Sequence, residues 1–116
     1  MSLPTDYAAR KALPIFDGVV MYFPDALAAV AEVSVAGNAQ HNQGEMLHWA
    51  RGKSMDQYNT ALRHMIDHRQ GNARDTDNTR HLAKAAWRIL AALQLSIEQE
   101  AAQDADETRI ALRDGS

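Results

Sequence analysis

Residues 24–36 constrain the fold most, because they combine the sequence signals of a helix with an almost entirely apolar composition. Pro24 suits the first position of a helix, and Asp25 favours the positive end of the helix dipole. Gly37 follows where a left-handed cap would end the helix. The sequence therefore predicts a helix over residues 24–36. A helix that is apolar on all sides belongs in a core, so we expect other helices to cover it.

Glu32 is the one ionisable side chain in the middle of this apolar run, and no cationic partner lies within a turn of it. A carboxylate in an apolar core must find hydrogen bonds, a cation or a metal ion, or else take up a proton. We interpret Glu32 as a candidate metal ligand and catalytic residue. Asp25 lies on the same helix face, seven residues earlier. The alternatives are a helix-start charge for Asp25 and a core ion pair with an arginine for Glu32.

Two further helices are predicted later in the chain. The helix over 55–69 follows Ser54, which forms a capping box with Gln57, and Gly71 lies just beyond its end. No segment alternates with a period of two for long enough to support a sheet, so the predicted fold class is all-α. The helix over 80–100 has an apolar stripe at helical spacing, formed by Leu82, Ala86, Ile89, Leu93 and Ile97.

The 116 residues are enough for one globular domain with a modest core, which oligomerisation would help to complete. We expect residues 1–23 to form an arm of irregular turns and residues 24–100 to form the helical core. Residues 101–116 are a charged tail that extends the last helix, packs on another subunit or frays. Residues 38–53 have the composition of a long loop between helices.

The composition limits the function classes. A net charge of −3 argues against nonspecific binding to duplex nucleic acid, so we expect no stable nucleic-acid complex. No apolar run approaches the roughly 18 residues of a membrane span, and residues 1–10 lack the apolar core of a secretory signal, so we expect a cytoplasmic protein. Without cysteine, a metal ion must be held by carboxylate and imidazole groups, which favours magnesium or manganese.

The predicted helix over 55–69 carries an imidazole and a carboxylate one turn apart. Thr60, His64 and Asp67 share one face of it, a spacing that suits a metal ion. The same pair also occurs on ordinary solvated helix faces. Combined with Glu32 from a second helix, His64 and Asp67 resemble carboxylate sites that are built between facing helices of a bundle.

The predicted helix over 80–100 carries a basic stripe away from its apolar stripe, formed by His81, Lys84 and Arg88. A solvated helix face explains this stripe equally well. A basic stripe that faces a carboxylate cluster, however, suits a polyphosphate, because cations bind the outer oxygens while metal ions bridge carboxylate and phosphate. Lys53 and Arg63 could add to the phosphate contacts.

The predicted loop holds candidate contacts for a base or sugar. Trp49 and His48 could stack on or border a base, and Asn38 and Asn42 offer donors and acceptors to its edge. Trp49 is equally suited to a core position. No glycine-rich phosphate loop and no Gly-x-Ser-x-Gly elbow occurs in the sequence.

Several separated strings of the sequence resemble one known group. The strings are KALPI at 11–15, YFPDAL at 22–27, GN at 37–38, QHN at 40–42, LHWARGKS at 47–54, LRH at 62–64 and HLAKAAWR at 81–88. In this order they resemble the phage dATP/dGTP diphosphohydrolase family. Its members are small relatives of the MazG nucleotide pyrophosphohydrolases and include the MazZ enzymes of 2-aminoadenine phages. The similarity covers roughly residues 10–98.

The resemblance implies an all-α, MazG-like helical bundle that is completed as a homodimer or homotetramer. It implies an enzyme that hydrolyses a (deoxy)nucleoside triphosphate between its α and β phosphates, with two or more Mg²⁺ or Mn²⁺ ions. The products are the monophosphate and pyrophosphate. The favoured substrate is dGTP, which is converted to dGMP in phage 2-aminoadenine nucleotide metabolism in the host cytoplasm.

The family pattern is only partly present. MazG proteins carry a Glu-Glu-x-x-Glu run on one helix and Glu-x-x-Asp on the next, whereas here Glu32 stands alone and His64-x-x-Asp67 replaces the second motif. The resemblance therefore assigns Glu32 and Asp67 as catalytic metal ligands, with His64 beside them. The phosphate contacts that it implies are Lys53, Lys84 and Arg88.

Two readings from other function classes compete with the enzyme. A non-catalytic helical phage protein could use Trp49 and the basic stripe to hold nucleic acid or a partner helix. A structural oligomer could pair Glu32 with Arg63 or Arg88 across helices. Pyrophosphate release from a nucleotide separates the enzyme from both alternatives.

Overall fold

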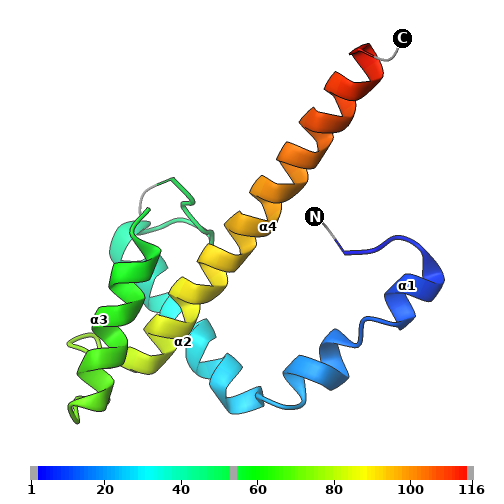
Figure 1. The fold of residues 1–116 in the computed structure, drawn as a ribbon. Helices are drawn as coiled ribbons and strands as arrows, with labels where there is room; N and C mark the ends of the chain where they lie inside the picture. The colour runs from blue at the N-terminus through cyan, green and yellow to red at the C-terminus, as the bar shows by residue number, and fades with distance from the viewer. Residues whose placement is uncertain (1–2, 53–54, 115–116) are drawn as a thin grey trace.

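The computed structural model describes residues 3–52 and 55–114 as a set of helices joined by short connections (Figure 1). The described residues contain no strand beyond an isolated bridge between Arg74 and Arg80, so the all-α prediction is confirmed. The elements in chain order are α1 (Tyr7–Lys11), the π-helix η1 (Phe16–Val20), α2 (Pro24–His41), α3 (Gln57–Arg69) and α4 (His81–Asp114).

Helix α4 is the element on which the other long helices pack. Both α3 and α2 contact it, and they do so along its N-terminal half (Figure 1). The C-terminal half of α4 and the arm that carries α1 extend away from this packed region, which gives an elongated chain. The packed region is therefore built from the N-terminal half of α4, α3 and one side of α2.

The buried apolar side chains of the described residues are all alanines. Ala61 of α3 and Ala83, Ala85 and Ala91 of α4 are each exposed by 6% or less. Small side chains let the axes of two helices approach closely. Close approach leaves little room between α3 and α4 for large side chains, so the larger apolar residues lie elsewhere.

The apolar stripe predicted on the last helix is largely exposed in the single chain. Leu82, Ile89 and Leu93 are 48%, 46% and 54% exposed, whereas His81 is only 6% exposed. The face of α4 that carries His81, Ala85 and Arg88 packs on α3, where His81 hydrogen bonds with His64 and Arg88 with Gln57. The basic stripe therefore faces into the structure. The alternative that this stripe is an ordinary solvated helix face is excluded.

Helix α2 corrects the expectation that Glu32 is buried. Helix α2 has no buried residue, because α4 covers it on one side only. Val33 and Ser34 lie on the covered side, whereas Glu32 and Asp25 are exposed on the other side. Because most residues of this apolar segment are alanines, α2 exposes little apolar area per residue. It can therefore lie at the surface of the single chain.

The predicted end of this helix at residue 36 is also wrong, because α2 continues through Gly37 to His41. The backbone N–H of Asn42 donates to the carbonyl of Asn38 (2.8 Å), and the side-chain amide of Asn42 donates to Asn38 Oδ1 (3.1 Å). These two bonds hold the last turn. Glycine in an ordinary helical conformation weakens a helix without ending it, and the side chains around it decide where the helix stops.

The prediction of α3 is confirmed closely. The helix begins at Gln57, and the proposed capping residue Ser54 lies outside the described residues. At the other end, Gly71 adopts the left-handed φ of 100° and donates to the carbonyl of His68 (3.1 Å), while Asn72 donates to that of Asp67 (3.0 Å). This pair of bonds is a Schellman motif, as expected for a glycine just beyond a helix end.

The two ends of the chain are more helical than predicted. The arm was expected to form irregular turns, but it contains α1, which Asp6 caps by accepting from the backbone N–H of Ala9 (3.0 Å), and the π-helix η1. Residues 101–114 continue the last helix, because α4 runs to Asp114, and the alternative of packing on another subunit stays a prediction.

Among the described residues, no single helix is both long enough and apolar enough to cross a membrane. Only the segments Tyr7–Val20 and Pro24–His41 pass such a test together, by length and composition, and they are bent by 87° at their junction.

Gly71, just beyond the end of α3, and Gly37, inside α2, give opposite predictions for substitution by alanine. We expect Gly71→Ala to lower the free energy of unfolding by about 1 kcal/mol, because a Cβ disfavours the left-handed conformation. The matched control Gly37→Ala should raise it by about 0.5–1 kcal/mol, because Gly37 is helical and a Cβ there meets no atom within 4 Å. Urea unfolding followed by circular dichroism measures both, and equal effects of the two substitutions would contradict this account of the helix ends.

Candidate functional site

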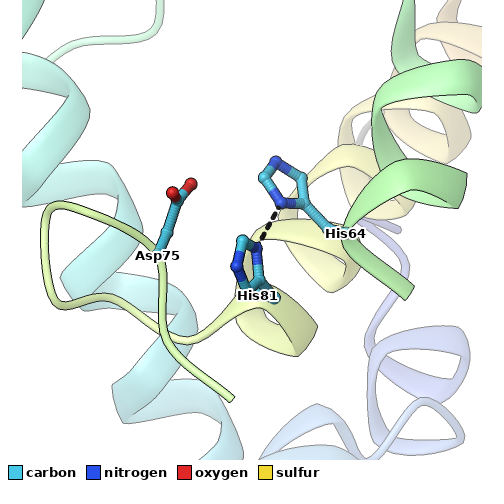
Figure 2. Close-up of side chains that lie close together, drawn as sticks. All are labelled: His64, Asp75 and His81. Atoms are coloured by element: carbon cyan, nitrogen blue, oxygen red, sulfur yellow. Dashed lines mark hydrogen bonds between the residues drawn. The ribbon is translucent and has the colours of Figure 1, made fainter. Parts of the chain in front are cut away.

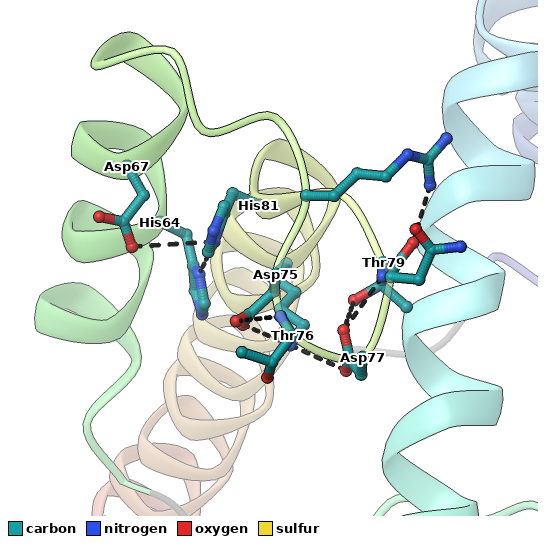
Figure 3. Close-up of polar contacts among 10 residues, drawn as sticks. His64, Asp67, Asp75, Thr76, Asp77, Thr79 and His81 are labelled. Carbon is teal, nitrogen blue, oxygen red and sulfur yellow. Dashed lines mark hydrogen bonds and ion pairs between the residues drawn. The ribbon is translucent and has the colours of Figure 1, made fainter.

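The connection between α3 and α4 positions two carboxylates beside α4. The backbone N–H of Asn78 donates to the carbonyl of Asp75 (2.9 Å), and that of Asp75 donates to the carbonyl of Thr79 (2.8 Å). Asn78 has a φ of 66°, a left-handed conformation that asparagine tolerates better than most residues. This tight turn presents Asp75 and Asp77 towards α4, directly before its first residue, His81 (Figure 3).

His64, Asp75 and His81 form a cluster of possible metal ligands from three successive elements (Figure 2). One ligand atom of each residue lies within 4.8 Å of the others. The two Nδ1 atoms of the histidines are 2.9 Å apart, so one ring donates a hydrogen bond to the other. Asp67 flanks the cluster, with its Oδ2 3.8 Å from Nδ1 of His81. Two imidazoles and a carboxylate are a donor set that fits a divalent transition-metal ion.

The environment of His64 favours the ligand form of its ring. Burial, followed by the nearby charges of His81 and Lys84, lowers the pKa of His64. Its ring is therefore neutral at pH 7, which is the form in which imidazole binds a metal ion. The site offers a nitrogen lone pair without first having to release a proton.

Lys84 joins the two carboxylates of the turn. Its Nζ lies 2.7 Å from Oδ2 of Asp75 and 2.9 Å from Oδ2 of Asp77. Burial of Lys84 opposes its charge, but the hydrogen bonds to Asp75 and Asp77 outweigh burial and raise the pKa of Lys84. The hydrogen bond from the hydroxyl of Thr79 (2.6 Å), aided by those from Lys84 and the Thr79 backbone, lowers the pKa of Asp77 to about 2. All three charged groups are ionised at neutral pH.

A cavity of about 1140 Å³ opens between α2, the loop that follows it, α3 and α4. His64, Asp75 and Lys84 line it at the N-terminal end of α4, and Arg88 follows one turn later. Further along α4, the lining becomes apolar; its members there include Leu90, Leu93 and Ile97, with Val30 and Val33 across from them on α2. The cavity thus combines a charged part with an apolar part.

Arg88 occupies the boundary between these two parts. Its Nη1 donates to Oε1 of Gln57 (3.2 Å), and its guanidinium lies 5.6 Å from the ring centroid of Trp87. Burial, followed by the charge of Arg63, lowers the pKa of Arg88. Two guanidinium groups near one another repel, so an anionic ligand bound by Arg88 in the cavity would be favoured.

The aromatic residues lie beside the apolar part of the cavity. The rings of Trp49 and Trp87 meet edge to face with centroids 5.7 Å apart, and Nε1–H of Trp87 donates to the hydroxyl of Ser34 (2.9 Å). The guanidinium of Arg51 lies 4.4 Å from the ring centroid of Trp49. Both tryptophans line the cavity. Trp49 therefore packs on α4 and also borders the cavity, and its contact with a base stays a prediction.

The expected base contacts are largely engaged in holding the loop. Asn38 donates to the carbonyl of Glu45 (3.1 Å) and accepts from Asn42 and from the backbone N–H of His48. The ring of His48 hydrogen bonds with the carbonyl of Met46 (3.0 Å). Asn38, Asn42 and His48 all line the cavity, so the loop conformation that they fix shapes one of its walls.

The structure brings together most, but not all, of the residues that the sequence singles out. His64, Asp67, Lys84 and Arg88 lie in or beside one site, as expected from two facing helices. Glu32 is exposed on the side of α2 that faces away from the cavity, so the chain itself does not bring it to this site. The proposed phosphate contact Lys53 lies outside the described residues.

Asp75 and Asp77 are the site residues that sequence reasoning missed. They lie between the predicted helices over 55–69 and 80–100, where the sequence pattern predicts no site residue. The signal that could have revealed them is the pair of aspartates at i and i+2 in a tight turn, followed closely by His81 at the start of a helix. Closely spaced carboxylates in a turn are a common way to present oxygen ligands to a cation.

One family model matches the sequence, that of the dATP/dGTP diphosphohydrolase N-terminal domain, over residues 7–105. The chain belongs to the dATP/dGTP diphosphohydrolase family. No curated protein and no solved structure matches the chain. The match confirms the resemblance drawn from the sequence strings, and it makes the chain an enzyme of the nucleoside triphosphate diphosphatase class. All described residues of the site lie inside the matched segment of this diphosphohydrolase.

The ion pair in the turn predicts a specific acid dependence of stability. The folded state holds the pKa of Asp77 at about 2, below its ordinary value of 3.8, so its stabilisation is present above pH 3.8 and is lost as the pH falls towards 2. We expect Asp77→Asn to lower the free energy of unfolding at pH 7 by about 1 kcal/mol, after discounting for partial solvent exposure.

Urea unfolding of the metal-free protein between pH 7 and pH 2 measures this effect. The difference between wild type and Asp77→Asn should shrink below pH 4. Asp104→Asn, which removes an exposed carboxylate from the distal part of α4, is the matched control and should change stability little at any pH. A constant deficit of Asp77→Asn down to pH 2 would contradict the proposed role of the charge.

Proposed function

We propose that this diphosphohydrolase hydrolyses dATP and dGTP between the α and β phosphates in the cavity beside α4, with a divalent metal ion held by His64, Asp75 and His81. The observation that carries the proposal is the metal-ligand cluster at the cationic end of a cavity large enough for a nucleoside triphosphate. Family membership supplies the reaction class. The non-catalytic binding module has no comparable support.

The residues present fit a divalent ion. His64 and His81 offer nitrogen ligands and Asp75 an oxygen ligand, a mixture that favours Mn²⁺ over Mg²⁺, which prefers oxygen alone. Such an ion, when bound, neutralises phosphate charge and lowers the pKa of water. Asp67, beside His81, is placed to hold the ring orientation or to accept a proton from an attacking water.

The cationic side chains orient the triphosphate. Lys84 and Arg88 lie one turn apart on α4 and line the same cavity, so they can contact successive phosphate groups of an extended chain. Positive charge next to the leaving pyrophosphate stabilises the charge that develops on it as the bond breaks. Lys53 remains a candidate phosphate contact on the loop.

The apolar part of the cavity suits the purine. Its tryptophans and aliphatic side chains exclude water and offer ring faces and edges to a flat base. The name of the matched family supports both dATP and dGTP as substrates. The narrower proposal of dGTP, acting in the 2-aminoadenine nucleotide metabolism of a phage within its host cytoplasm, rests on the family resemblance of the sequence.

The outward-facing apolar side chains support a homodimer or homotetramer. Leu62, Met65 and Ile66 of α3 are 42–50% exposed, and the apolar stripe of α4 is exposed as well. A chain whose buried apolar residues are all small gains most of its remaining stabilisation by covering these surfaces with another copy. In such an assembly, the exposed face of α2 with Glu32 could meet a second chain.

Substitution of Asp75 tests the placement of the site. We expect Asp75→Asn to reduce kcat for pyrophosphate release from dGTP with Mn²⁺ by at least 100-fold, because it removes a metal ligand and a partner of Lys84. Asp104→Asn is the matched control and should retain wild-type activity. Circular dichroism confirms that both variants are folded. An active Asp75→Asn enzyme would contradict the site.

Glu32→Gln distinguishes this site from the one predicted on α2. Because Glu32 faces away from the cavity, we expect Glu32→Gln to keep activity within about threefold of wild type. A loss as large as that of Asp75→Asn, with an unchanged melting temperature, would instead place the reaction at the outer face of α2. A lowered melting temperature with retained specific activity would indicate a structural ion pair between copies.

The oligomer has its own test. We expect a solution mass of two or four chains by light scattering, and Ile89→Glu should shift the mass towards one chain by placing a charge on the exposed stripe of α4. Thr108→Glu, on the distal and exposed part of α4, is the control and should leave the mass unchanged. A wild-type mass of one chain would contradict the assembly.

A further inference from the structure

Lys84 occupies the position from which a second cation would bind the carboxylates of the turn. Its ammonium group lies within 3 Å of one oxygen of Asp75 and one oxygen of Asp77. Lys84 comes from α4, one turn beyond His81, and its side chain is only 19% exposed. The ammonium therefore lies between Asp75, a member of the metal-ligand cluster, and Asp77.

The partners of Lys84 are fixed by the turn itself. Asp77 accepts hydrogen bonds from the hydroxyl and the backbone N–H of Thr79, and Asp75 accepts one from the backbone N–H of Thr76 (2.7 Å). These bonds orient the carboxylates before any ligand arrives (Figure 3). The lysine is consequently held in a built recess, which is unlike a flexible surface lysine that contacts a phosphate by chance.

The charges set a limit on how many ions the site can hold. Asp75, Asp77 and the flanking Asp67 together carry three negative charges, and Lys84 neutralises one of them. One divalent ion on His64, Asp75 and His81 already balances the remaining two. A second divalent ion near Asp77 would meet both the ammonium group and the first ion, and like charges at such short distances repel strongly.

We propose that Lys84 replaces a second divalent ion, so that each chain holds a single divalent ion on His64, Asp75 and His81 while the Lys84 ammonium supplies the other positive charge to the phosphates. This inference rests on the proposed function. It differs from the two or more ions that the family resemblance implies. Asp77 is then a positioning residue, because it holds Lys84 and binds no ion itself.

Counting bound Mn²⁺ ions tests the proposal without relying on activity. The full chain is titrated with Mn²⁺, and free Mn²⁺ is measured by electron paramagnetic resonance. We expect one ion per chain for wild type and two for Lys84→Met, which has a similar length but no charge and so frees both carboxylates. The double variant Lys84→Met/Asp77→Asn should return to one ion, and Lys84→Arg, which keeps the charge, should stay at one.

Each alternative result has a clear meaning. Two or more ions in wild type, one ion in Lys84→Met, or two ions in the double variant would each overturn the replacement of an ion by Lys84. No bound ion in wild type would overturn it together with the proposed metal site. Circular dichroism monitors folding; if Lys84→Met does not fold, the counts for wild type and Lys84→Arg decide, and anything other than one ion in either overturns the proposal.

A parallel pyrophosphate assay on wild type separates this inference from the proposed function. Pyrophosphate release by a protein that binds two ions keeps the function and removes the inference. Conversely, suppose that the protein binds one ion as wild type and two as Lys84→Met, yet releases no pyrophosphate from any deoxynucleoside triphosphate. That outcome would support the role of Lys84 and contradict the proposed function.

Discussion

The close, alanine-lined contact between α3 and α4 is the constraint on which the rest of the structure depends. The buried Ala61 lies between Gln57 and His64 on the contacting face of α3, and Ala85 lies between His81 and Arg88 on that of α4. Because these two alanines are small, the two helices approach closely enough for His64 and His81 to share a hydrogen bond. The same approach forces the short connection between them to fold back as a tight turn. The turn then places its carboxylates against α4, so packing by small side chains brings a cluster of charged groups together.

This arrangement reverses the usual distribution of side chains in a small helical domain. The polar faces of α3 and α4 turn inward and satisfy one another; among the described residues, no buried polar side-chain atom lacks a hydrogen-bond partner. The large apolar residues of the same helices, such as Met65 and Ile89, turn outward. A site made of buried charges is costly to assemble in one small chain. Covering the outward apolar surface with a second copy would offset that cost, which links the proposed oligomer to the proposed site.

Much of the fold could be predicted from the sequence, because local signals decide it. The helical class, the extent of α3 and the role of Gly71 follow from spacing and from backbone preferences that neighbouring chains do not alter. The burial of Glu32 could not be predicted, because an alanine-rich run is compatible with both core and surface, and only tertiary packing selects between them. Gly37 does not end the helix for a related reason. The hydrogen bond between the side chains of Asn38 and Asn42 stabilises the turn that follows Gly37.

The site was predictable to the extent that it lies on helices. The spacing of His64 and Asp67, and of Lys84 and Arg88, fixes which side chains share a face, whereas the contribution of Asp75 and Asp77 depends on a turn whose direction no local pattern specifies. That turn also changes the electrostatic role of Lys84 in the basic stripe. On a bare helix, Lys84 would be a solvated charge or a simple phosphate contact. Held between two oriented carboxylates and close to His64, it becomes part of the inner electrostatics of the cluster. In the proposed site, Lys84 then determines how many ions the cluster can hold, although Lys84 itself binds none.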